Sequence, residues 1–314
     1  MKKAIEVVDL VKRYKKADKN SVDGISLSVS EGEFYSFLGP NGAGKTTTIS
    51  ILTTTLAKTS GTVTIAGYDL DKQASDVRRS IGVIFQNQSL DLNLTAEENI
   101  RLHAVLYGLY TFRPTFSMMT KSYKTRVQEL AKILSIEKDL FKPIKTFSGG
   151  MKRKLEIVRS LIHKPKVLFL DEPTAGLDPI SRKNLWDYLQ EVRRTEKTTV
   201  FLTTHYLDEA EGADHIAIIN NGKIIRYGTP DTIKKTLVED YLLISAKDKI
   251  QLAKELKSKK IKFVQNGHVK INLGKDSAQE VIKRIDTKLD FIQIHTPSLE
   301  EAYVEIIGQQ QTSI

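Results

Sequence analysis

The sequence contains no cysteine. This absence excludes disulfide bonds and thiolate metal sites, and it says little about the cellular compartment. No stretch approaches the roughly 18 apolar residues that a membrane-spanning helix needs. Residues 1–6 lack the apolar core of a signal peptide, and there is no internal repeat or low-complexity segment. We therefore expect a folded cytosolic protein that at most docks on a membrane.

The chain does have an excess of basic residues. Its formal net charge is +10, while its hydrophobic and charged contents of 40% and 27% are those of a soluble globular protein. The excess is uneven, because residues 87–164 contain 14 Lys and Arg residues against 7 Asp and Glu residues. Two interpretations stay open. The region is either a solvated lysine-rich surface, or a face containing Lys121, Lys124 and Arg126 that meets an anionic membrane surface or an acidic partner.

A glycine-rich stretch at residues 39–47 fills the phosphate-binding pattern G-x-x-x-x-G-K-[ST] at every fixed position. Glycines let the backbone curl so that several N–H groups point at a polyphosphate. Lys45 can reach the β- and γ-phosphates, and the Thr46 hydroxyl can bind Mg²⁺. The implied ligand is a nucleotide, held by Gly39, Pro40, Asn41, Gly42, Ala43, Gly44, Lys45, Thr46 and Thr47.

The flanking sequence predicts the strand and the helix that such a loop requires. Residues 33–38 are apolar and aromatic, and residues 46–56 carry apolar side chains without Gly or Pro. From residue 87 to residue 164 the pattern becomes helical, which indicates an insertion in an α/β core. Strands are predicted at 4–10, 25–29, 62–66 and 81–85, and helices of the insertion at 95–106, 121–134 and 149–161.

The α/β pattern resumes with a buried strand at 166–170, which delivers Asp171 and Glu172 to the edge where parallel sheets bind ligands. A helix at 179–194, a strand at 198–202, a helix at 206–211 and a hairpin of 215–219 and 223–227 complete this domain. Beyond residue 238 the order strand, helix, strand, strand, helix, strand predicts a ferredoxin-like arrangement. Its elements are expected at 240–246, 248–258, 260–265, 268–273, 276–286 and 290–295, followed by a helix to Ile307 with a capping box at Ser298 and Glu301.

The predicted fold class is therefore α/β with two domains. Residues 1–230 form a P-loop NTPase core with an antiparallel β subdomain and a helical insertion at about 87–164. Residues 231–314 form a small α+β accessory domain, ferredoxin-like, with a terminal helix.

Further motifs resemble those of ATP-binding cassette (ABC) proteins. Asp171-Glu172 after a buried strand is similar to a Walker B element, and the stretch 175–178 is similar to the D-loop. Phe147-Ser148-Gly149-Gly150-Met151 resembles the ABC signature motif. Tyr14, Gln86 and His205 stand at matching places in chain order. The resemblance covers residues 1 to about 230, and it implies a head-to-tail dimer that encloses two ATP molecules.

The resemblance also implies a role for each matched residue. Asp171, Thr46 and Gln86 would hold Mg²⁺, and Glu172 would orient or deprotonate the attacking water. Gln86 would also contact that water, His205 would contact the γ-phosphate, and Tyr14 would stack on adenine. Ser148, Gly149 and Gly150 would cap the γ-phosphate of the partner's ATP, with Asp178 of the D-loop as a further nucleotide-site residue. Taken alone, Tyr14, Gln86 and His205 could equally be ordinary structural residues.

Phe147, Met151 and the run 152–156 depart from the commonest signature sequence. They resemble the branch that serves ABC-2-type export permeases, including daunorubicin-resistance-type ATPases. This implies an ATPase subunit that forms a homodimer or heterodimer and powers a separate ABC-2-type membrane permease from the cytoplasmic face of the cell membrane. It implies no nucleic acid partner, and it leaves the cargo open among drugs, antibiotics, lipids and glycans.

Two alternatives come from other classes of protein. A soluble ABC ATPase that acts on nucleic acid or ribosomes suits the basic charge, but such proteins typically carry two cassettes or a long coiled-coil insertion, and this chain has one cassette. A regulatory module, in which residues 240–307 bind a small ligand or a partner, is also open because ferredoxin-like folds host many functions.

Overall fold

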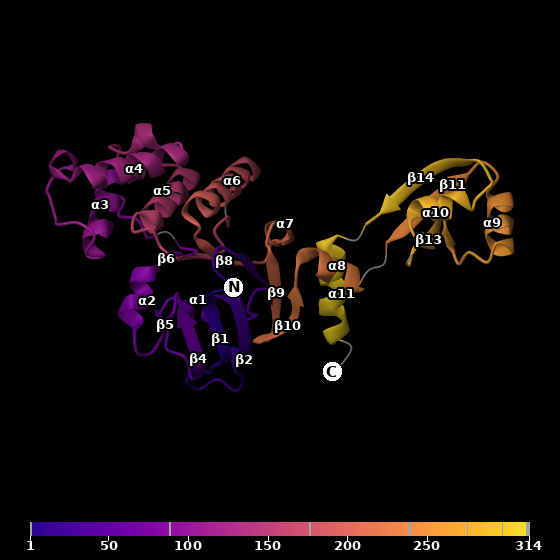
Figure 1. Cartoon of the computed structure of the whole chain (residues 1–314), viewed down its shortest axis with the longest axis horizontal. Coiled ribbons are helices and arrows are strands. Elements are labelled where there is room, and N and C mark those ends of the chain that lie inside the picture. Colours follow the sequence, from indigo (N-terminus) through magenta and orange to yellow (C-terminus); the bar gives the residue numbers. More distant parts are fainter. Residues whose placement is uncertain are drawn as a thin grey trace. The chain divides into compact units, whose positions relative to one another are not determined.

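The computed structural model describes residues 2–87, 89–175, 177–237, 240–274, 276–296 and 298–311. The chain divides into two compact units, Met1–Tyr227 and Gly228–Ile314 (Figure 1). Across the described ranges, we find no helix with the length and apolar character that crossing a bilayer requires.

The first unit is built on a six-stranded sheet with the strand order β10-β9-β3-β8-β7-β6. β3 pairs in parallel with β8 and β9, and β7 pairs in parallel with β6 and β8. β3 and β7 are buried along their whole length, as expected for central parallel strands. Because β3, β8, β7 and β6 are neighbours, the loops that follow them meet at one edge. The strands are β3 (Phe34–Leu38), β6 (Ile81–Ile84), β7 (Val167–Asp171), β8 (Thr199–Thr204), β9 (His215–Asn220) and β10 (Lys223–Gly228).

A second, antiparallel sheet in this unit has the order β2-β1-β4-β5. It shares one hydrophobic core with the six-stranded sheet, since Ile5 and Val63 belong to the same buried cluster as Phe37 and Phe169. Its strands are β1 (Lys3–Lys12), β2 (Val22–Ser30), β4 (Ser60–Ile65) and β5 (Tyr68–Asp69), and the neighbouring helices are α1 (Lys45–Leu52) and α2 (Ala74–Ser80).

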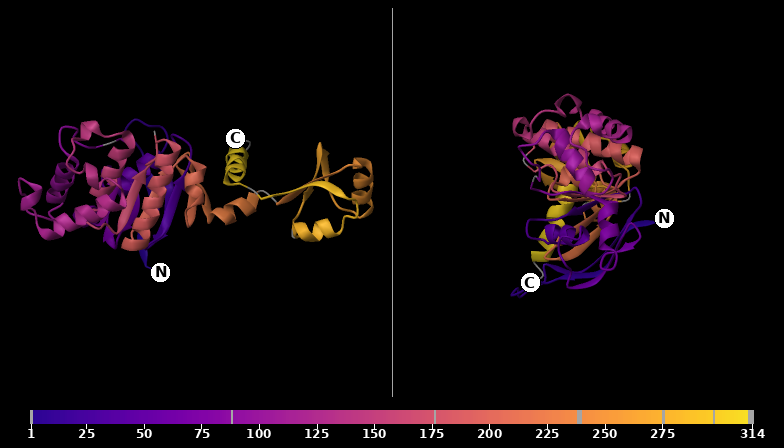
Figure 2. Two further views of the ribbon diagram at one scale, coloured as in Figure 1. Left: turned by 90° about the horizontal axis from the view of Figure 1, so that it is seen from above. Right: turned by 90° about the vertical axis from the view of Figure 1, so that its left-hand side faces the viewer.

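The helices of the insertion form a body beside the sheets (Figures 1 and 2). α5 (Gly149–Leu161) packs against α3 (Ala96–Leu106), α4 (Lys121–Ile133) and β6. Thr95 and Glu98 form a capping box at the start of α3, and the Thr120 side chain caps α4. The three helices predicted here are confirmed to within one residue at each end. The remaining helices of the unit are α6 (Pro179–Glu196) and α7 (Leu207–Glu211), with 3₁₀ turns at Phe116–Met118, Glu137–Asp139 and Ile144–Thr146.

The second unit contains a four-stranded antiparallel sheet with the order β12-β13-β11-β14. α9 and α10 cover one face of this sheet, because Leu252 and Val281 share a buried cluster with Leu242 and Ile271 of the strands (Figure 2). α8 packs against α11. The elements are α8 (Pro230–Leu237), β11 (Tyr241–Ala246), α9 (Lys249–Ser258), β12 (Val264–Asn266), β13 (His268–Asn272), α10 (Ala278–Lys283), β14 (Leu289–His295) and α11 (Leu299–Gln311).

Several predicted boundaries are wrong. α11 ends at Gln311 instead of Ile307, β2 begins at Val22 instead of residue 25, and α10 ends at Lys283 instead of residue 286. α1, the helix after the phosphate-binding loop, ends at Leu52 instead of residue 56. Just beyond Leu52, the Thr53 hydroxyl donates to the Ile49 carbonyl (2.8 Å), and Thr54 takes a left-handed φ of 63°. The strand expected at 260–265 is confined to β12, because the chain leaves α9 through Lys260 with φ 56° before it can pair. The pattern also missed α2 and β5, which are too short to show a period.

Arg126 does not lie on an exposed basic face. Only 8% of it is exposed, and its guanidinium donates to Glu196 Oε1 (2.6 Å) and to the Leu161 carbonyl (2.8 Å). The expectation that it belongs with Lys121 and Lys124 to a docking surface is therefore wrong. On α4 it shares the inward face with apolar side chains, and a partly buried ion pair with Glu196 compensates its charge.

Candidate nucleotide-binding site

The phosphate-binding loop joins β3 to α1 and depends on glycine at two positions of close approach. A Cβ added to Gly39 would lie 2.4 Å from the Ile219 carbonyl oxygen, and one added to Gly44 would lie 2.4 Å from that of Ser21. Gly44 also has φ 108° and is the residue that caps α1 without a side-chain hydrogen bond. The first N–H groups of a helix have no intrahelical partner, so this turn presents free donors to an anion.

Lys45 is the first residue of α1 and is only 4% exposed. Its Nζ donates to the carbonyls of Gly39 (2.8 Å) and Pro40 (3.1 Å) and lies 3.3 Å from Glu172 Oε1. The ammonium is therefore held inside the curve of its own loop, next to the Glu172 carboxylate that follows β7.

Two carboxylates stand at the end of β7. Asp171 is 2% exposed, and burial raises its pKa while a hydrogen bond from Thr203 Oγ1 (2.5 Å) and one from Thr46 act in the opposite direction. Glu172 follows with a left-handed φ of 46°, a conformation that costs about 1–2 kcal/mol in a non-glycine residue. Strain of this kind is concentrated at functional sites.

Gln86 and His205 converge on the same carboxylate. Gln86 Nε2 donates to Glu172 Oε2 (3.3 Å). His205 Nδ1 lies 3.3 Å from Glu172 Oε1, which is an ion-pair distance without the alignment of a hydrogen bond. Both residues line a cleft of about 490 Å³ together with the phosphate-binding loop, Glu172, Ala175 and Ser21.

Tyr14 lies beside this cleft rather than in its lining. The residue is 44% exposed, and its hydroxyl is 3.3 Å from Thr47 Oγ1 at the start of α1. Lys12 Nζ lies over the ring, 5.3 Å from its centroid, so an adenine ring would stack on the opposite face.

The residues that resemble the signature and the D-loop lie in a different place. Ser148 caps α5 by accepting a hydrogen bond from the Met151 N–H (3.2 Å), and Asp178 caps α6 by accepting from Ile180 and Ser181. Ser148 and Gly150 line a small pocket of about 110 Å³ with Ser181, and this pocket shares no residue with the loop cleft. Of the D-loop stretch, Gly176 is outside the described residues.

A profile of the ABC transporter family matches residues 22–175. Over 247 residues the chain is 40% identical to the daunorubicin/doxorubicin resistance ATP-binding protein DrrA of Streptomyces peucetius, and the match covers 78% of this chain and 71% of that protein. The linearmycin resistance ATP-binding protein LnrL of Bacillus subtilis is 31% identical over 318 residues, which cover 97% of this chain and 98% of that protein. The chain belongs to the ABC transporter family.

Solved structures agree with this membership. The structure of the ATP-binding subunit of an ABC transporter is 32% identical with a TM-score of 0.64, covering 74% of this chain and 92% of that chain. A dimeric ATP-binding cassette in a post-hydrolysis state, bound to ADP and Pi, is 26% identical with a TM-score of 0.63 and covers 72% and 98%. The protein is thus an ABC ATPase, and its first unit has the ABC ATPase fold.

Three buried charged residues of this ABC ATPase were not identified as site residues from the sequence. Arg153 and Glu156 are 4% and 2% exposed on α5, and Glu209 of α7 is 3% exposed. Glu209 accepts hydrogen bonds from Thr204 Oγ1 (2.6 Å) and Thr174 Oγ1. Since Thr204 directly precedes His205, these bonds fix the backbone next to His205. Burial raises the pKa of Glu209. For Arg153 and Glu156, charged residues at inward positions of an otherwise apolar helix face were the signal available in the sequence, whereas α7 is too short to show such a face.

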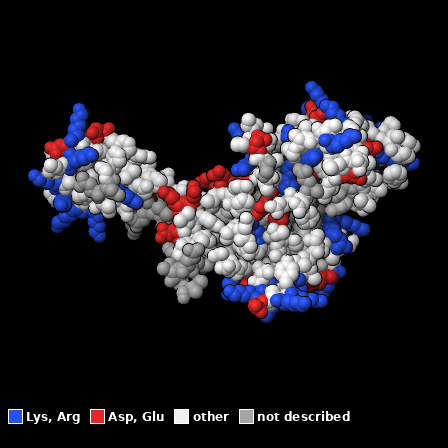
Figure 3. Space-filling model, turned by 180° about the vertical axis from the view of Figure 1, so that it is seen from behind, with Lys and Arg blue, Asp and Glu red and all other residues white. Residues whose placement is uncertain are grey.

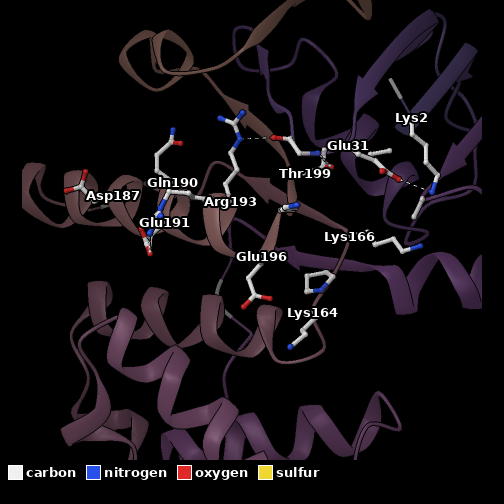
Figure 4. Close-up of a pocket in the computed structure, with 16 residues that line it drawn as sticks. Lys2, Glu31, Lys164, Lys166, Asp187, Gln190, Glu191, Arg193, Glu196 and Thr199 are labelled. Atoms are coloured by element: carbon white, nitrogen blue, oxygen red, sulfur yellow. Dashed lines mark hydrogen bonds and ion pairs between the residues drawn. The ribbon is translucent and has the colours of Figure 1, made fainter.

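A large cleft of the ABC ATPase core is separate from the nucleotide site. It has a volume of about 1060 Å³, and none of the residues that line it belongs to the phosphate-binding loop. Lys164 and Lys166 line it before β7 begins, so it lies at the sheet edge opposite the loop (Figure 4). Its acidic and basic side chains are interspersed, with Lys2 paired to Glu31 at 3.2 Å.

We predict that Gly44→Ala abolishes ATP binding, whereas Gly42→Ala weakens it. Both positions have positive φ, 108° and 80°, so each alanine carries a backbone cost of about 1–3 kcal/mol. Only the Gly44 variant also drives a Cβ into the Ser21 carbonyl, since nothing lies within 4 Å of a Cβ at Gly42. Titration with a fluorescent ATP analogue and thermal melting of both variants check this. Equal affinity of the two variants would contradict the close-approach argument.

Proposed function

We propose that this ABC ATPase is the nucleotide-binding subunit of an exporter and powers a separate ABC-2-type membrane permease. The hydrolytic part of the proposal is carried by the meeting at the Glu172 carboxylate of Lys45, Gln86 and His205, each within 3.3 Å. The similarity to the resistance ATP-binding proteins supports the export part. These residues follow β3, β6 and β8, so four separate segments of the chain supply one reaction centre.

The proposed roles follow from this geometry. Lys45 binds the β- and γ-phosphates, and the backbone N–H groups of residues 39–47 surround them. Glu172 accepts the proton of the attacking water, with Gln86 and His205 orienting the water and the γ-phosphate. Tyr14 stacks on the adenine ring.

The residues present also fit a magnesium ion. Thr46 lies close enough to Asp171 to lower its pKa by hydrogen bonding, so a hydroxyl and a carboxylate stand together at the loop. Within the described ranges, no group of three or more His, Cys, Asp or Glu side chains is placed to hold a metal. Mg²⁺ is bound through one or two protein oxygens together with substrate phosphates and waters, and a hydroxyl beside a carboxylate fits that pattern. The ion supplies neutralisation of phosphate charge, and Thr46, Asp171 and Gln86 are the residues that would hold it.

We also propose that two ATPase subunits, identical or homologous, complete each other's sites. The pocket with Ser148 and Gly150 shares no residue with the loop cleft of the same chain. A second subunit in head-to-tail arrangement would bring its Ser148, Gly149 and Gly150 to the γ-phosphate, with Asp178 alongside. The similarity to a dimeric ATP-binding cassette supports this arrangement.

The second unit is proposed as a ferredoxin-like accessory domain within residues 231–314, following an ATP-binding domain within residues 1–230. Its βαββαβ element order and its strand order β12-β13-β11-β14 support this assignment. The names of relatives suggest the cargo class, since they include drug and antibiotic resistance proteins and the Nod factor export ATP-binding protein I of Paraburkholderia xenovorans. We place the subunit at the cytoplasmic face of the membrane, without a nucleic acid partner.

Glu172→Gln should reduce ATP hydrolysis by about 10²–10⁴-fold, or roughly 3–5 kcal/mol of barrier, because the amide cannot accept the proton. Nucleotide binding should survive, so this variant should collect as an ATP-bound dimer in gel filtration. Lys45→Ala should instead lose the phosphate contact and stay monomeric with ATP. Hydrolysis by Glu172→Gln at the wild-type rate would assign the base role to another residue.

Lys121→Glu/Lys124→Glu should weaken co-purification with the permease. Figure 3 shows acidic residues among the basic ones on one face of the insertion, so the attraction to a partner would not depend on two lysines alone. We therefore expect a partial loss of association with the permease. Lys254→Glu/Lys257→Glu on α9 is the control with the same charge change. Equal effects of the two pairs would indicate a response to net charge and not a docking surface.

A chain that ends at residue 236 should bind ATP with near-normal affinity. The nucleotide cleft is built from residues of the first unit alone, whereas dimerisation or coupling to transport should change. Isothermal titration of a truncated protein whose circular dichroism shows a fold checks this. Loss of ATP binding in such a folded protein would exclude the proposed division between the units.

A further inference from the structure

A buried ion pair stands inside α5, the helix that begins at the signature residues. Arg153 Nη1 lies 2.9 Å from Glu156 Oε2, and the two residues are 4% and 2% exposed. Buried charges are costly unless they are paired and fully hydrogen-bonded. The further hydrogen bonds of this pair therefore identify the segments that it fixes in place.

Arg153 donates hydrogen bonds to backbone carbonyls of the two loops that carry Gln86 and Glu172. Its Nη1 donates to the Phe85 carbonyl (2.6 Å), directly before Gln86. Its Nε donates to the Pro173 carbonyl (2.7 Å), and Nη2 reaches the Glu172 carbonyl at 3.4 Å. One rigid guanidinium therefore fixes the loop after β6 and the loop after β7 relative to α5.

Glu156 and Arg159 hold the far side of the Gln86 loop. Glu156 Oε1 accepts a hydrogen bond from the Ser89 N–H (2.9 Å), and Arg159 Nη1 donates to the Ser89 carbonyl (2.6 Å). The segment that carries Gln86 is thus attached to α5 both before and after that residue.

We propose that Arg153 and Glu156 are positioning residues that transmit the placement of the signature helix to Gln86 and Glu172 of the same chain. The proposal rests on the proposed function, in which Ser148 contacts ATP bound by the partner. Arg153 lies five residues along the same helix, about 7.5 Å from Ser148 at 1.5 Å per residue. Because a buried pair cannot give up its partners without desolvated charge, a movement of α5 carries both loops with it. Nucleotide in one site therefore orders the water-activating residues of the other.

The chain offers a matched control pair of the same chemistry. Arg101 Nε lies 3.0 Å from Glu97 Oε1, and both residues are buried in α3. Arg101 also donates to two loop carbonyls, those of Arg113 (2.6 Å) and Pro114 (2.8 Å). That loop belongs to the insertion itself, so this pair contributes to stability without contacting the segments of Gln86 or Glu172.

The experiment compares Arg153→Met/Glu156→Gln with Arg101→Met/Glu97→Gln in the full-length protein. Each double variant removes both charges of its own pair, and Arg159 keeps its hydrogen bond to the Ser89 carbonyl when Glu156 is replaced. We expect both to lower the melting temperature similarly and to leave the Kd for ATP within about twofold, while only the Arg153 variant lowers kcat, by about tenfold or more. Loss of kcat in both variants in proportion to melting temperature would reduce the pair to a structural role and overturn the proposal.

A mutant cycle with Ser148→Ala tests the transmission itself. If Arg153 acts through the signature helix, its double variant should lower kcat much less in the Ser148→Ala background than in the wild-type background, whereas the Arg101 double variant should leave kcat unchanged in both backgrounds. An equal fold loss of kcat from the Arg153 double variant in the two backgrounds would overturn the proposal. Arg153→Lys keeps the ion pair with Glu156, but a lysine cannot donate to the loops after β6 and β7 at the same time. This variant should therefore also lower kcat. An unchanged kcat in Arg153→Lys would exclude the positioning role.

Glu172→Gln in the same series distinguishes a failure of the proposed function from a failure of the positioning role. If Glu172→Gln hydrolyses ATP normally, the proposed function of that residue fails. If Glu172→Gln is inactive and the Arg153 variants are fully active, only the positioning role fails.

Discussion

The buried carboxylate of Glu172 is the constraint on which the arrangement of the first unit depends. A charge that is only 7% exposed requires partners, and Lys45, Gln86 and His205 supply them from three other segments. Their meeting is possible because β3, β8, β7 and β6 are consecutive in the sheet. Parallel strands end at a common edge, so sheet order converts four distant stretches of sequence into one site.

Hydrogen bonds to backbone carbonyls extend this centre into the helical insertion. Arg153 contacts the loops after β6 and β7, and Glu209 holds Thr174 and Thr204 next to them. Arg153, Glu156 and Glu209 thus connect buried polar groups around the nucleotide edge. The large cleft at the opposite edge differs from this centre. Its acidic and basic side chains are interspersed, and none of its lining residues belongs to the phosphate-binding loop.

Local patterns were sufficient for most of the secondary structure. The predicted helices of the insertion agree with α3, α4 and α5 because each has a capping residue and an apolar stripe of helical period. The strand predicted at 260–265 failed, since short elements have no period to read and the left-handed turn at Lys260 delays pairing until β12. Arg126 failed for a different reason. Its charge suggested the surface, and only a partner 70 residues away, Glu196, makes its burial possible.

The sequence by itself determined the chemistry of this protein. The glycine spacing of residues 39–47, the acidic pair at the end of a buried strand and the serine-glycine helix start are local signals. The close approaches at Gly39 and Gly44 and the positive φ of Gly44 explain why glycine is required there. The tertiary structure decided which side chains meet: the sheet order, the convergence on Glu172, and the burial of Arg153, Glu156 and Arg126. These depend on hydrogen bonds between residues far apart in the chain, and no local period or propensity encodes the partner of a buried charge.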